Sequence, residues 1–290
     1  MLHVRDVRKR YGDVVAVDGV SFEVSAGEIF GLLGPNGAGK TSLIRMIVDI
    51  LRPDAGVIQV FGRPMAADLQ HRVGYLPEER GLYQQHKVGD VLLFLAELKG
   101  LSRADAKAKS ERFLERVDLS HARDKRMRDL SKGMQQKLLL AAVMQHEPDL
   151  LILDEPFIGL DPINRQMVLS LVREAVDRGA AVILSTHLMD QVEALCSRAM
   201  LIHRGRTLLS GTVRAMRETY AETGVLLESD ARLEGHPDVV SRLGDRFQLA
   251  EGVRPEDFLA AVLATGCAVR RFERLVPSLE EVFVRAVGSS

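Results

Sequence analysis

The sequence predicts an α/β fold whose parallel sheet carries functional residues at the ends of its strands, followed by a small C-terminal α+β unit. Three observations predict this fold. A glycine-rich loop at residues 34–41 lies between an apolar run and a segment of helical character. Two further apolar runs, residues 150–153 and 180–184, end in Asp-Glu and in Ser-Thr-His. Because open α/β sheets bind ligands at the carboxyl ends of their strands, these three segments predict one shared site.

The composition is typical of a globular protein with one large domain or two ordinary ones. Of 290 residues, 46% are hydrophobic and 27% are charged. The net charge of −1 gives no support for a bulk attraction to nucleic acid, so we expect no nucleic-acid partner. Cys196 and Cys267 are too few for a disulfide framework and lack metal-ligand spacing. Without a signal peptide pattern or an apolar run long enough to span a bilayer, we expect a cytosolic chain.

The first thirty residues predict an antiparallel β layer. Residues 2–30 alternate between apolar and polar side chains, with turns at residues 11–13 and 25–27. Tyr11 lies at the first turn. It is either an aromatic at the edge of the core or, near a nucleotide, a ring that stacks on the purine.

The glycine-rich loop matches G-x-x-x-x-G-K-[ST], the P-loop pattern, between a predicted strand and a predicted helix. Glycines allow backbone N–H groups to curl around phosphate oxygens, and the helix N-terminus adds its positive dipole end. Lys40 offers a charge to the β- and γ-phosphates, and Thr41 offers a hydroxyl to Mg²⁺. The predicted nucleotide-binding residues here are Gly34, Pro35, Asn36, Gly37, Ala38, Gly39, Lys40, Thr41 and Ser42.

The middle of the chain predicts a helical insertion in the α/β core. Strand patterns at residues 57–62 and 73–77 give way to helical periodicity over about residues 86–146. Ser131, followed by Gly133, opens a helix expected at residues 138–145. This segment is either a simple helix cap or a second anion site with free N–H groups.

Acidic and polar residues follow the next two predicted strands. Asp154 is expected to hold Mg²⁺, and Glu155 to orient or deprotonate an attacking water. The simpler interpretation of both carboxylates is an acidic start to the next helix. His187 ends the following strand and is expected to contact the γ-phosphate, although a lone histidine is often structural.

Taken in order, these motifs make residues 1–215 resemble an ABC transporter ATP-binding domain, with residues 216–290 as an accessory domain. The resemblance implies ATP and Mg²⁺ as ligands. It implies that Tyr11 stacks on adenine, that Asp154 and Glu155 are the Walker B aspartate and the catalytic glutamate, and that His187 is the switch histidine. It also implies that a signature segment and a D-loop aspartate contribute Ser131, Gly133, Gln135 and Asp161 to the ATP site.

Three positions depart from the family pattern. Lys132 and Met134 stand where the most common signature has glycine. Glu78 stands where the family has a glutamine that ligates Mg²⁺ and senses the membrane partner; a carboxylate retains the ability to ligate the metal. The tail at residues 277–283 resembles the accessory domain of type-2 ABC exporters, and residues 75–83 resemble their sodium-extrusion branch.

The resemblance implies the ATPase motor of an exporter, held at the inner face of the membrane by separate permease subunits. Two copies would share ATP between the P-loop of one and the signature of the other. A homodimer would then have two competent sites, and a heterodimer stays open. Two alternatives also stay open: a soluble ABC-type ATPase acting on ribosomes or DNA, and a small-molecule kinase with a P-loop. A single P-loop and the absence of heptads or repeats disfavour the first, and Ser131, Gln135 and His187 would have no role in the second.

Overall fold

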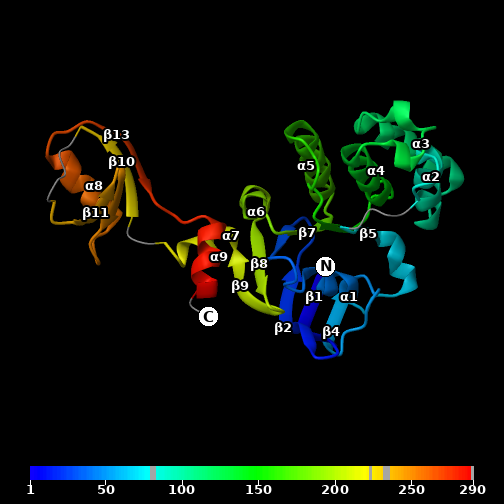
Figure 1. Cartoon of the computed structure of the whole chain (residues 1–290), viewed down its shortest axis with the longest axis horizontal. Coiled ribbons are helices and arrows are strands. Elements are labelled where there is room, and N and C mark those ends of the chain that lie inside the picture. The colour runs from blue at the N-terminus through cyan, green and yellow to red at the C-terminus, as the bar shows by residue number, and fades with distance from the viewer. Residues whose placement is uncertain (79–82, 222–223, 231–235, 289–290) are drawn as a thin grey trace. The chain divides into compact units, whose positions relative to one another are not determined.

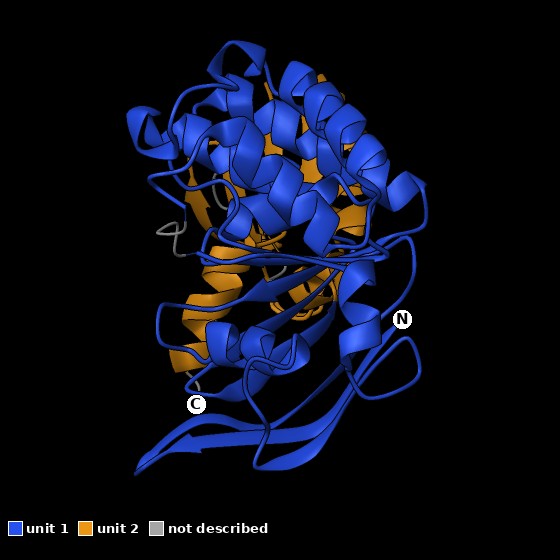
Figure 2. Ribbon diagram, turned by 90° about the vertical axis from the view of Figure 1, so that its right-hand side faces the viewer, with its two compact units in different colours: residues 1–211 blue, residues 212–290 orange. Residues whose placement is uncertain are grey.

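The computed structural model describes residues 1–78, 83–221, 224–230 and 236–288 (Figure 1). Residues 79–82, part of the stretch that resembles the sodium-extrusion branch, lie outside the described residues. The chain divides into two compact units, Met1–Gly211 and Thr212–Ser290, which Figure 2 shows in different colours. Each unit has its own cluster of buried apolar side chains.

The first unit contains a six-stranded sheet that brings the predicted strand ends together. Its strands in spatial order are β5 (Val73–Leu76), β6 (Leu150–Asp154), β7 (Ala181–Thr186), β3 (Ile29–Leu33), β8 (Arg198–His203) and β9 (Arg206–Thr212). The pairs from β5 to β8 are parallel. Leu33 pairs with Thr186, and Asp154 pairs with Ser185, so β3, β6 and β7 all end at the same edge. This edge is where the sequence predicts the site.

The predicted antiparallel layer is confirmed in the first unit. It has the order β2 (Val14–Val24), β1 (Leu2–Tyr11) and β4 (Ala55–Val60). The helix α1 (Lys40–Ile47) contacts β2 and β4, and its buried face belongs to the same apolar cluster as the six-stranded sheet. The helix that begins at the P-loop is therefore packed into an apolar core of the unit.

The predicted helical insertion is also confirmed. It consists of α2 (Val88–Leu98), α3 (Arg103–Arg116) and α4 (Lys132–Met144), with short 3-10 turns at Ser120–Ala122 and Met127–Asp129. Another 3-10 turn, Ala67–Arg72, lies before β5. The helix expected at residues 138–145 begins earlier, at Lys132, because the Ser131 hydroxyl accepts the Met134 N–H at 3.3 Å and caps it. Two more helices, α5 (Pro162–Asp177) and α6 (Met189–Leu195), contact the sheet at β7.

The second unit is a small α+β domain, as predicted. Its sheet has the order β11 (Val239–Leu243), β12 (Arg246–Leu249), β10 (Gly224–Ser229) and β13 (Val269–Arg274). The helix α8 (Pro255–Ala264) buries Phe258 and Val262 in the same cluster as the sheet residues. Two further helices, α7 (Val213–Glu218) and α9 (Leu279–Gly288), contact each other. The sequence did not predict β11, most of whose side chains are exposed.

Gly31 tests the packing between the central sheet and α6. A β-carbon at Gly31 would lie 2.6 Å from Val192 Cγ1 and 3.2 Å from Ala199 Cβ. Gly31→Ala is therefore expected to lower the free energy of unfolding by about 1–3 kcal/mol, measured by urea denaturation. Val192→Ala removes the clashing methyl groups, so the double variant should lose less stability than the sum of the single variants. Additive losses would contradict this account.

Candidate functional site

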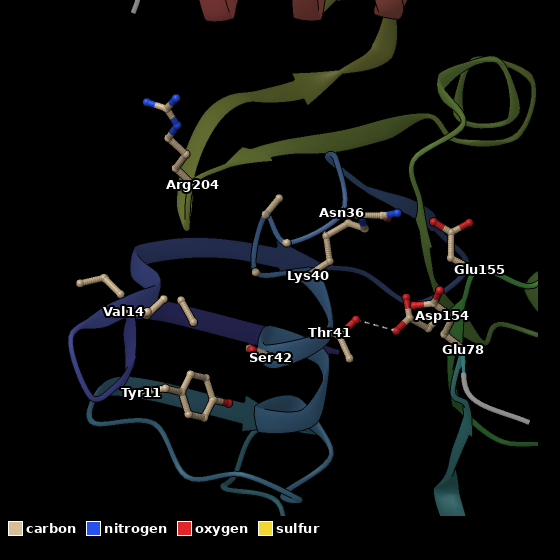
Figure 3. Close-up of a pocket in the computed structure, with 15 residues that line it drawn as sticks. Tyr11, Val14, Asn36, Lys40, Thr41, Ser42, Glu78, Asp154, Glu155 and Arg204 are labelled. Atoms are coloured by element: carbon tan, nitrogen blue, oxygen red, sulfur yellow. Dashed lines mark hydrogen bonds between the residues drawn. The ribbon is translucent and has the colours of Figure 1, made fainter. Parts of the chain in front are cut away.

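A cavity of about 710 Å³ lies where the P-loop meets the ends of β6 and β1 (Figure 3). Segments far apart in the sequence contribute to its lining. The lining residues are Tyr11, Val14, Val15, Ala16, Asn36, Gly37, Ala38, Gly39, Lys40, Thr41, Ser42, Glu78, Asp154, Glu155 and Arg204. The structure thus brings the P-loop, both predicted acidic residues, Tyr11 and Glu78 around one space.

Two P-loop glycines are required by close backbone contacts. Gly39 caps α1 with a φ of 107°, and a β-carbon there would lie 2.2 Å from the Ala16 carbonyl oxygen. At Gly34, a β-carbon would lie 2.3 Å from the Ile202 carbonyl oxygen. The loop is therefore fixed between β2 and β8, with the N-terminus of α1 facing the cavity lining.

Lys40 is almost fully buried at the start of α1. Its ammonium group donates to the carbonyl oxygens of Gly34 at 2.7 Å and Pro35 at 3.2 Å. Burial holds the pKa of Lys40 below its ordinary value, while the nearby carboxylates of Glu155 and Asp154 oppose that shift. An anionic phosphate can give this poorly solvated cation a better partner than the two carbonyl groups.

Asp154 and Thr41 form a cluster of oxygen atoms beside Lys40. Asp154 accepts hydrogen bonds from the Thr41 hydroxyl at 3.1 Å and the Ser185 hydroxyl at 2.7 Å. Burial raises the pKa of Asp154 above its ordinary value, although both hydroxyl groups act in the opposite direction. A hydroxyl and a carboxylate are the hard oxygen ligands that Mg²⁺ prefers, and phosphate oxygens would complete its shell. Glu78 lines the same cavity and is exposed.

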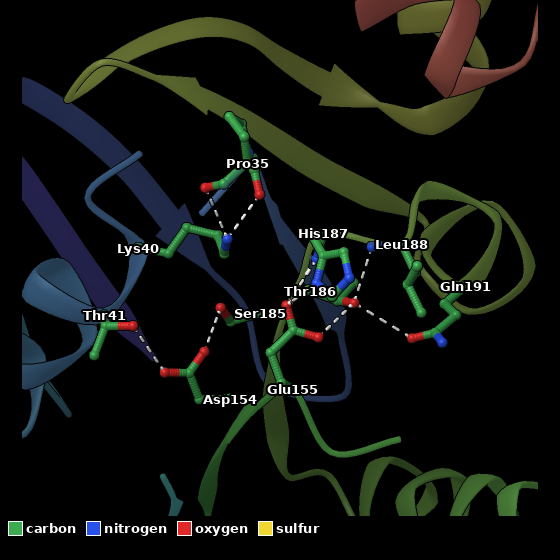
Figure 4. A network of polar contacts seen from close by, with 11 residues as sticks. Pro35, Lys40, Thr41, Asp154, Glu155, Ser185, Thr186, His187, Leu188 and Gln191 are labelled. Carbon is green, nitrogen blue, oxygen red and sulfur yellow. Dashed lines mark hydrogen bonds and ion pairs between the residues drawn. The ribbon is translucent and has the colours of Figure 1, made fainter. Parts of the chain in front are cut away.

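Glu155 follows β6 directly and is held by the last residue of β7, Thr186, and by His187, which follows it (Figure 4). One carboxylate oxygen, Oε1, accepts from the His187 backbone N–H at 2.9 Å and lies 2.6 Å from His187 Nδ1. The other oxygen, Oε2, accepts from the Thr186 hydroxyl at 3.1 Å. Glu155 has a φ of 50°, a conformation that costs energy in a residue other than glycine and that recurs at active sites.

Tyr11 and two valines form the apolar part of the cavity. Tyr11 is 45% exposed and Val14 is 65% exposed, although both are large apolar side chains. The ammonium group of Lys9 lies 5.8 Å from the Tyr11 ring centroid and is bound to Asp54 at 2.8 Å. A flat, exposed aromatic ring beside aliphatic side chains is a surface on which a nucleobase can stack.

The other predicted residues lie outside this cavity. Ser131 caps α4, and a β-carbon at Gly133 would lie 3.3 Å from the Gly159 carbonyl oxygen, so the start of α4 packs on the loop that follows Glu155. The Gln135 amide donates to the carbonyl oxygens of Met127 at 3.0 Å and Leu130 at 3.1 Å. Asp161 caps α5 through the Asn164 N–H at 2.9 Å, and its pKa is lowered by that bond. His187 is not among the lining residues, but it contacts Glu155, which is.

Several residues that line this cavity carry no recognisable signal in the sequence. Arg204, in the turn between β8 and β9, lines the cavity because Gly205 donates its N–H to the Ala38 carbonyl at 3.0 Å. A basic residue next to glycine in a short turn carries no motif that would have identified it. Val14 and Val15 belong to a strand pattern whose exposed end is visible only in the fold.

Fold and site together define a P-loop protein that binds a nucleoside triphosphate. A family model described as ABC transporter matches residues 17–158, and a model of the DrrA1-3-like ATP-binding protein C-terminal domain matches residues 211–287. A solved structure titled as the ATP-binding subunit of an ABC transporter aligns with a TM-score of 0.72 at 31% identity, covering 76% of this chain and 93% of that one. The cbiO1 structure from Clostridium perfringens, part of the cbiONQ transporter complex, gives a TM-score of 0.64 at 28% identity and covers 73% of this chain and 88% of that one.

Two relatives match over nearly their whole lengths. The uncharacterised ABC transporter ATP-binding protein YhaQ of Bacillus subtilis is 36% identical, with 100% of this chain and 99% of the relative covered. The Nod factor export ATP-binding protein I of Burkholderia pseudomallei is 41% identical, with 98% of this chain and 96% of the relative covered. The chain belongs to the family of ABC transporter ATP-binding proteins. Within the described ranges, no helix has both the length and the apolar character needed to cross a membrane.

The raised pKa of Asp154 predicts a trade-off between stability and function. Well below pH 3.8, the Asp154 side chain is protonated in both the folded and the unfolded state and does not change the stability with pH. Above its raised pKa it is ionised in both states, and burial of the charge then lowers the free energy of unfolding. Asp154→Asn is therefore expected to increase the free energy of unfolding at pH 7 by about 1 kcal/mol in the nucleotide-free protein. Urea denaturation over a pH series should show this gain shrinking as the pH falls.

Asp161→Asn is the control, because the pKa of Asp161 is shifted in the opposite direction to that of Asp154. The pKa of Asp161 is lowered, chiefly by the Asn164 N–H, so loss of its charge should give no gain in stability at pH 7. A loss of stability in Asp154→Asn at pH 7, or equal gains in both variants, would contradict the assignment.

Proposed function

We propose that this chain hydrolyses ATP with Mg²⁺ and so drives an exporter. The observation that carries the proposal is that Glu155, Lys40 and the Thr41–Asp154 pair lie around one cavity. These residues supply the three requirements of phosphoryl transfer: a group that orients water, a charge for the phosphates, and oxygen ligands for a metal ion.

Each residue has a separate task in this proposal. The P-loop N–H groups and Lys40 bind the β- and γ-phosphates, and Tyr11 stacks on adenine. Thr41 and Asp154 would hold Mg²⁺, with Glu78 as a further oxygen ligand, and the metal would neutralise phosphate charge. The Glu155 carboxylate orients a water molecule and accepts its proton as that water attacks the γ-phosphorus. His187 fixes Glu155 and contacts the γ-phosphate once nucleotide is present.

The site is completed by a second ATP-binding subunit, which we propose is a second copy of this chain. Ser131 and Gly133 lie at the exposed start of α4, outside the cavity of their own chain. The helix N-terminus and its N–H groups favour an anion, so they suit the γ-phosphate of ATP held by the other copy. A twofold dimer would place one signature segment on each of two sites, with Asp161 and Gln135 supporting the same contact from α5 and α4.

The transporter would consist of this dimer and separate integral membrane subunits. We propose a cytoplasmic location at the inner face of the membrane, because the chain belongs to a family of transporter subunits. Export is supported by the similarity to the Nod factor export protein and by the match of residues 211–287 to the DrrA1-3-like domain. The alternative is a soluble ABC-type ATPase that acts on ribosomes or DNA.

Glu155→Gln is expected to abolish turnover and to trap ATP in a closed dimer, because the amide keeps the side-chain shape but accepts no proton. Light scattering with Mg·ATP should give twice the mass of the 32.1 kDa chain. Glu155→Gln combined with Lys40→Ala is the control and should stay monomeric, since Lys40→Ala weakens ATP binding measured by calorimetry. A Glu155→Gln chain that stays monomeric at saturating ATP would count against the shared site.

A pull-down from membranes with the Glu155→Gln chain and Mg·ATP tests the transporter assignment. Co-purification of a polytopic membrane protein is the expected result, and the Lys40→Ala chain shows which partners depend on nucleotide. Recovery of ribosomes or DNA without a membrane protein would support the alternative while leaving the ATPase chemistry in place.

A further inference from the structure

The hydroxyl group of Thr186 links Glu155 to a buried glutamine in α6 (Figure 4). Thr186 Oγ1 lies 3.1 Å from Glu155 Oε2 and 3.4 Å from Gln191 Oε1, and it accepts the Leu188 N–H at 3.1 Å. Thr186 is fully buried, and Gln191 is 6% exposed. A hydroxyl group has one hydrogen to donate and two lone pairs, so it cannot donate to both neighbours at once.

The charge of Glu155 decides where this hydrogen lies. An ionised carboxylate oxygen attracts a donor more strongly than an amide oxygen, and Glu155 is also the closer of the two acceptors. Gln191 Oε1 would then face a lone pair of the hydroxyl. At the same time, Gln191 Nε2 is buried with no hydrogen-bond partner among the described residues, which is costly for a donor.

A half-turn of the Gln191 carboxamide removes the conflict at the hydroxyl group and moves the amide oxygen to the buried position of Nε2. It exchanges the oxygen and the nitrogen, so that an N–H group points at Thr186 Oγ1. The Thr186 hydroxyl then accepts hydrogen bonds from Leu188 and Gln191 and donates one to Glu155. Its one hydrogen and both of its lone pairs are thereby used. Two donors on the hydroxyl oxygen also polarise its O–H group toward the carboxylate.

We infer that Thr186 and Gln191 are positioning residues for Glu155: Gln191 orients the Thr186 hydroxyl, and the hydroxyl holds Oε2 while His187 holds Oε1. This inference rests on the proposed function, in which Glu155 orients the attacking water. Neither side chain lines the cavity, so neither is expected to contribute to ATP affinity. A carboxylate held at both oxygens stays at one angle toward the water, which is the condition for efficient proton transfer.

Thr186→Val keeps the shape of the side chain and removes its hydroxyl. We expect kcat for ATP hydrolysis to fall about tenfold, with KM for ATP changed less than about twofold, because the lost bond acts only on the reacting group. Thr186→Ser retains the hydroxyl and should recover most of kcat. A role in packing alone would give the opposite pattern, since serine removes a methyl group that valine keeps. Calorimetry with ATP and circular dichroism show whether each variant is folded.

Gln191→Met keeps the length of the side chain and removes both polar atoms. It should lower kcat about threefold in the wild-type background and have no further effect in Thr186→Val, because Gln191 acts through the hydroxyl. Additive losses, unchanged kcat in Thr186→Val, or no rescue by Thr186→Ser would overturn the inference. Failure of the proposed function looks different: the wild-type chain would not hydrolyse ATP, or Glu155→Gln would retain turnover.

Discussion

The structure of the first unit depends on the parallel alignment of β3, β6 and β7. Parallel strands end at the same edge of a sheet, and their pairing places Leu33, Asp154 and Thr186 on that edge. The P-loop, the acidic pair and His187 all follow directly from these ends. Each segment is buried and apolar up to its last residues, so the polar side chains emerge only where the sheet stops. One backbone constraint thus positions groups that are more than a hundred residues apart in sequence.

Burial at this edge creates electrostatic costs that a bound nucleotide can relieve. Burial lowers the pKa of Lys40, while neighbouring carboxylates oppose that shift and two carbonyl groups accept its hydrogen bonds. Burial also disfavours the charged form of Asp154, and therefore raises the pKa of that carboxyl group. A metal–triphosphate complex supplies an anion to the lysine and a cation to the aspartate. The cost in stability of burying Lys40 and Asp154 is therefore consistent with a site built to bind both an anion and a cation.

The sequence predicted the parts of the fold that have an apolar run, a clear hydrophobic periodicity or glycines in a recognisable loop motif. The apolar strands 29–33, 150–154 and 181–186, the P-loop glycines and the helical insertion all have such signals. It did not predict β11, because that strand is short and mostly exposed. Arg204 was missed for a different reason: its place at the cavity follows from one backbone bond between Gly205 and Ala38. Contacts of this kind depend on tertiary packing and leave no pattern in the sequence.

The hydrogen bonds around Glu155 explain why the acidic pair needs two different neighbours on β7. Ser185 binds Asp154, while Thr186 binds Glu155, so adjacent residues of one strand hold two carboxylates with different tasks. Neighbouring carboxylates raise each other's affinity for protons, because their negative charges repel. A hydrogen-bond donor on each carboxylate counteracts this effect for the metal ligand and for the group that receives a proton. Alternation along β7 gives each carboxylate its own donor. The pairing of β6 with β7 therefore determines the chemistry of both residues as well as their positions.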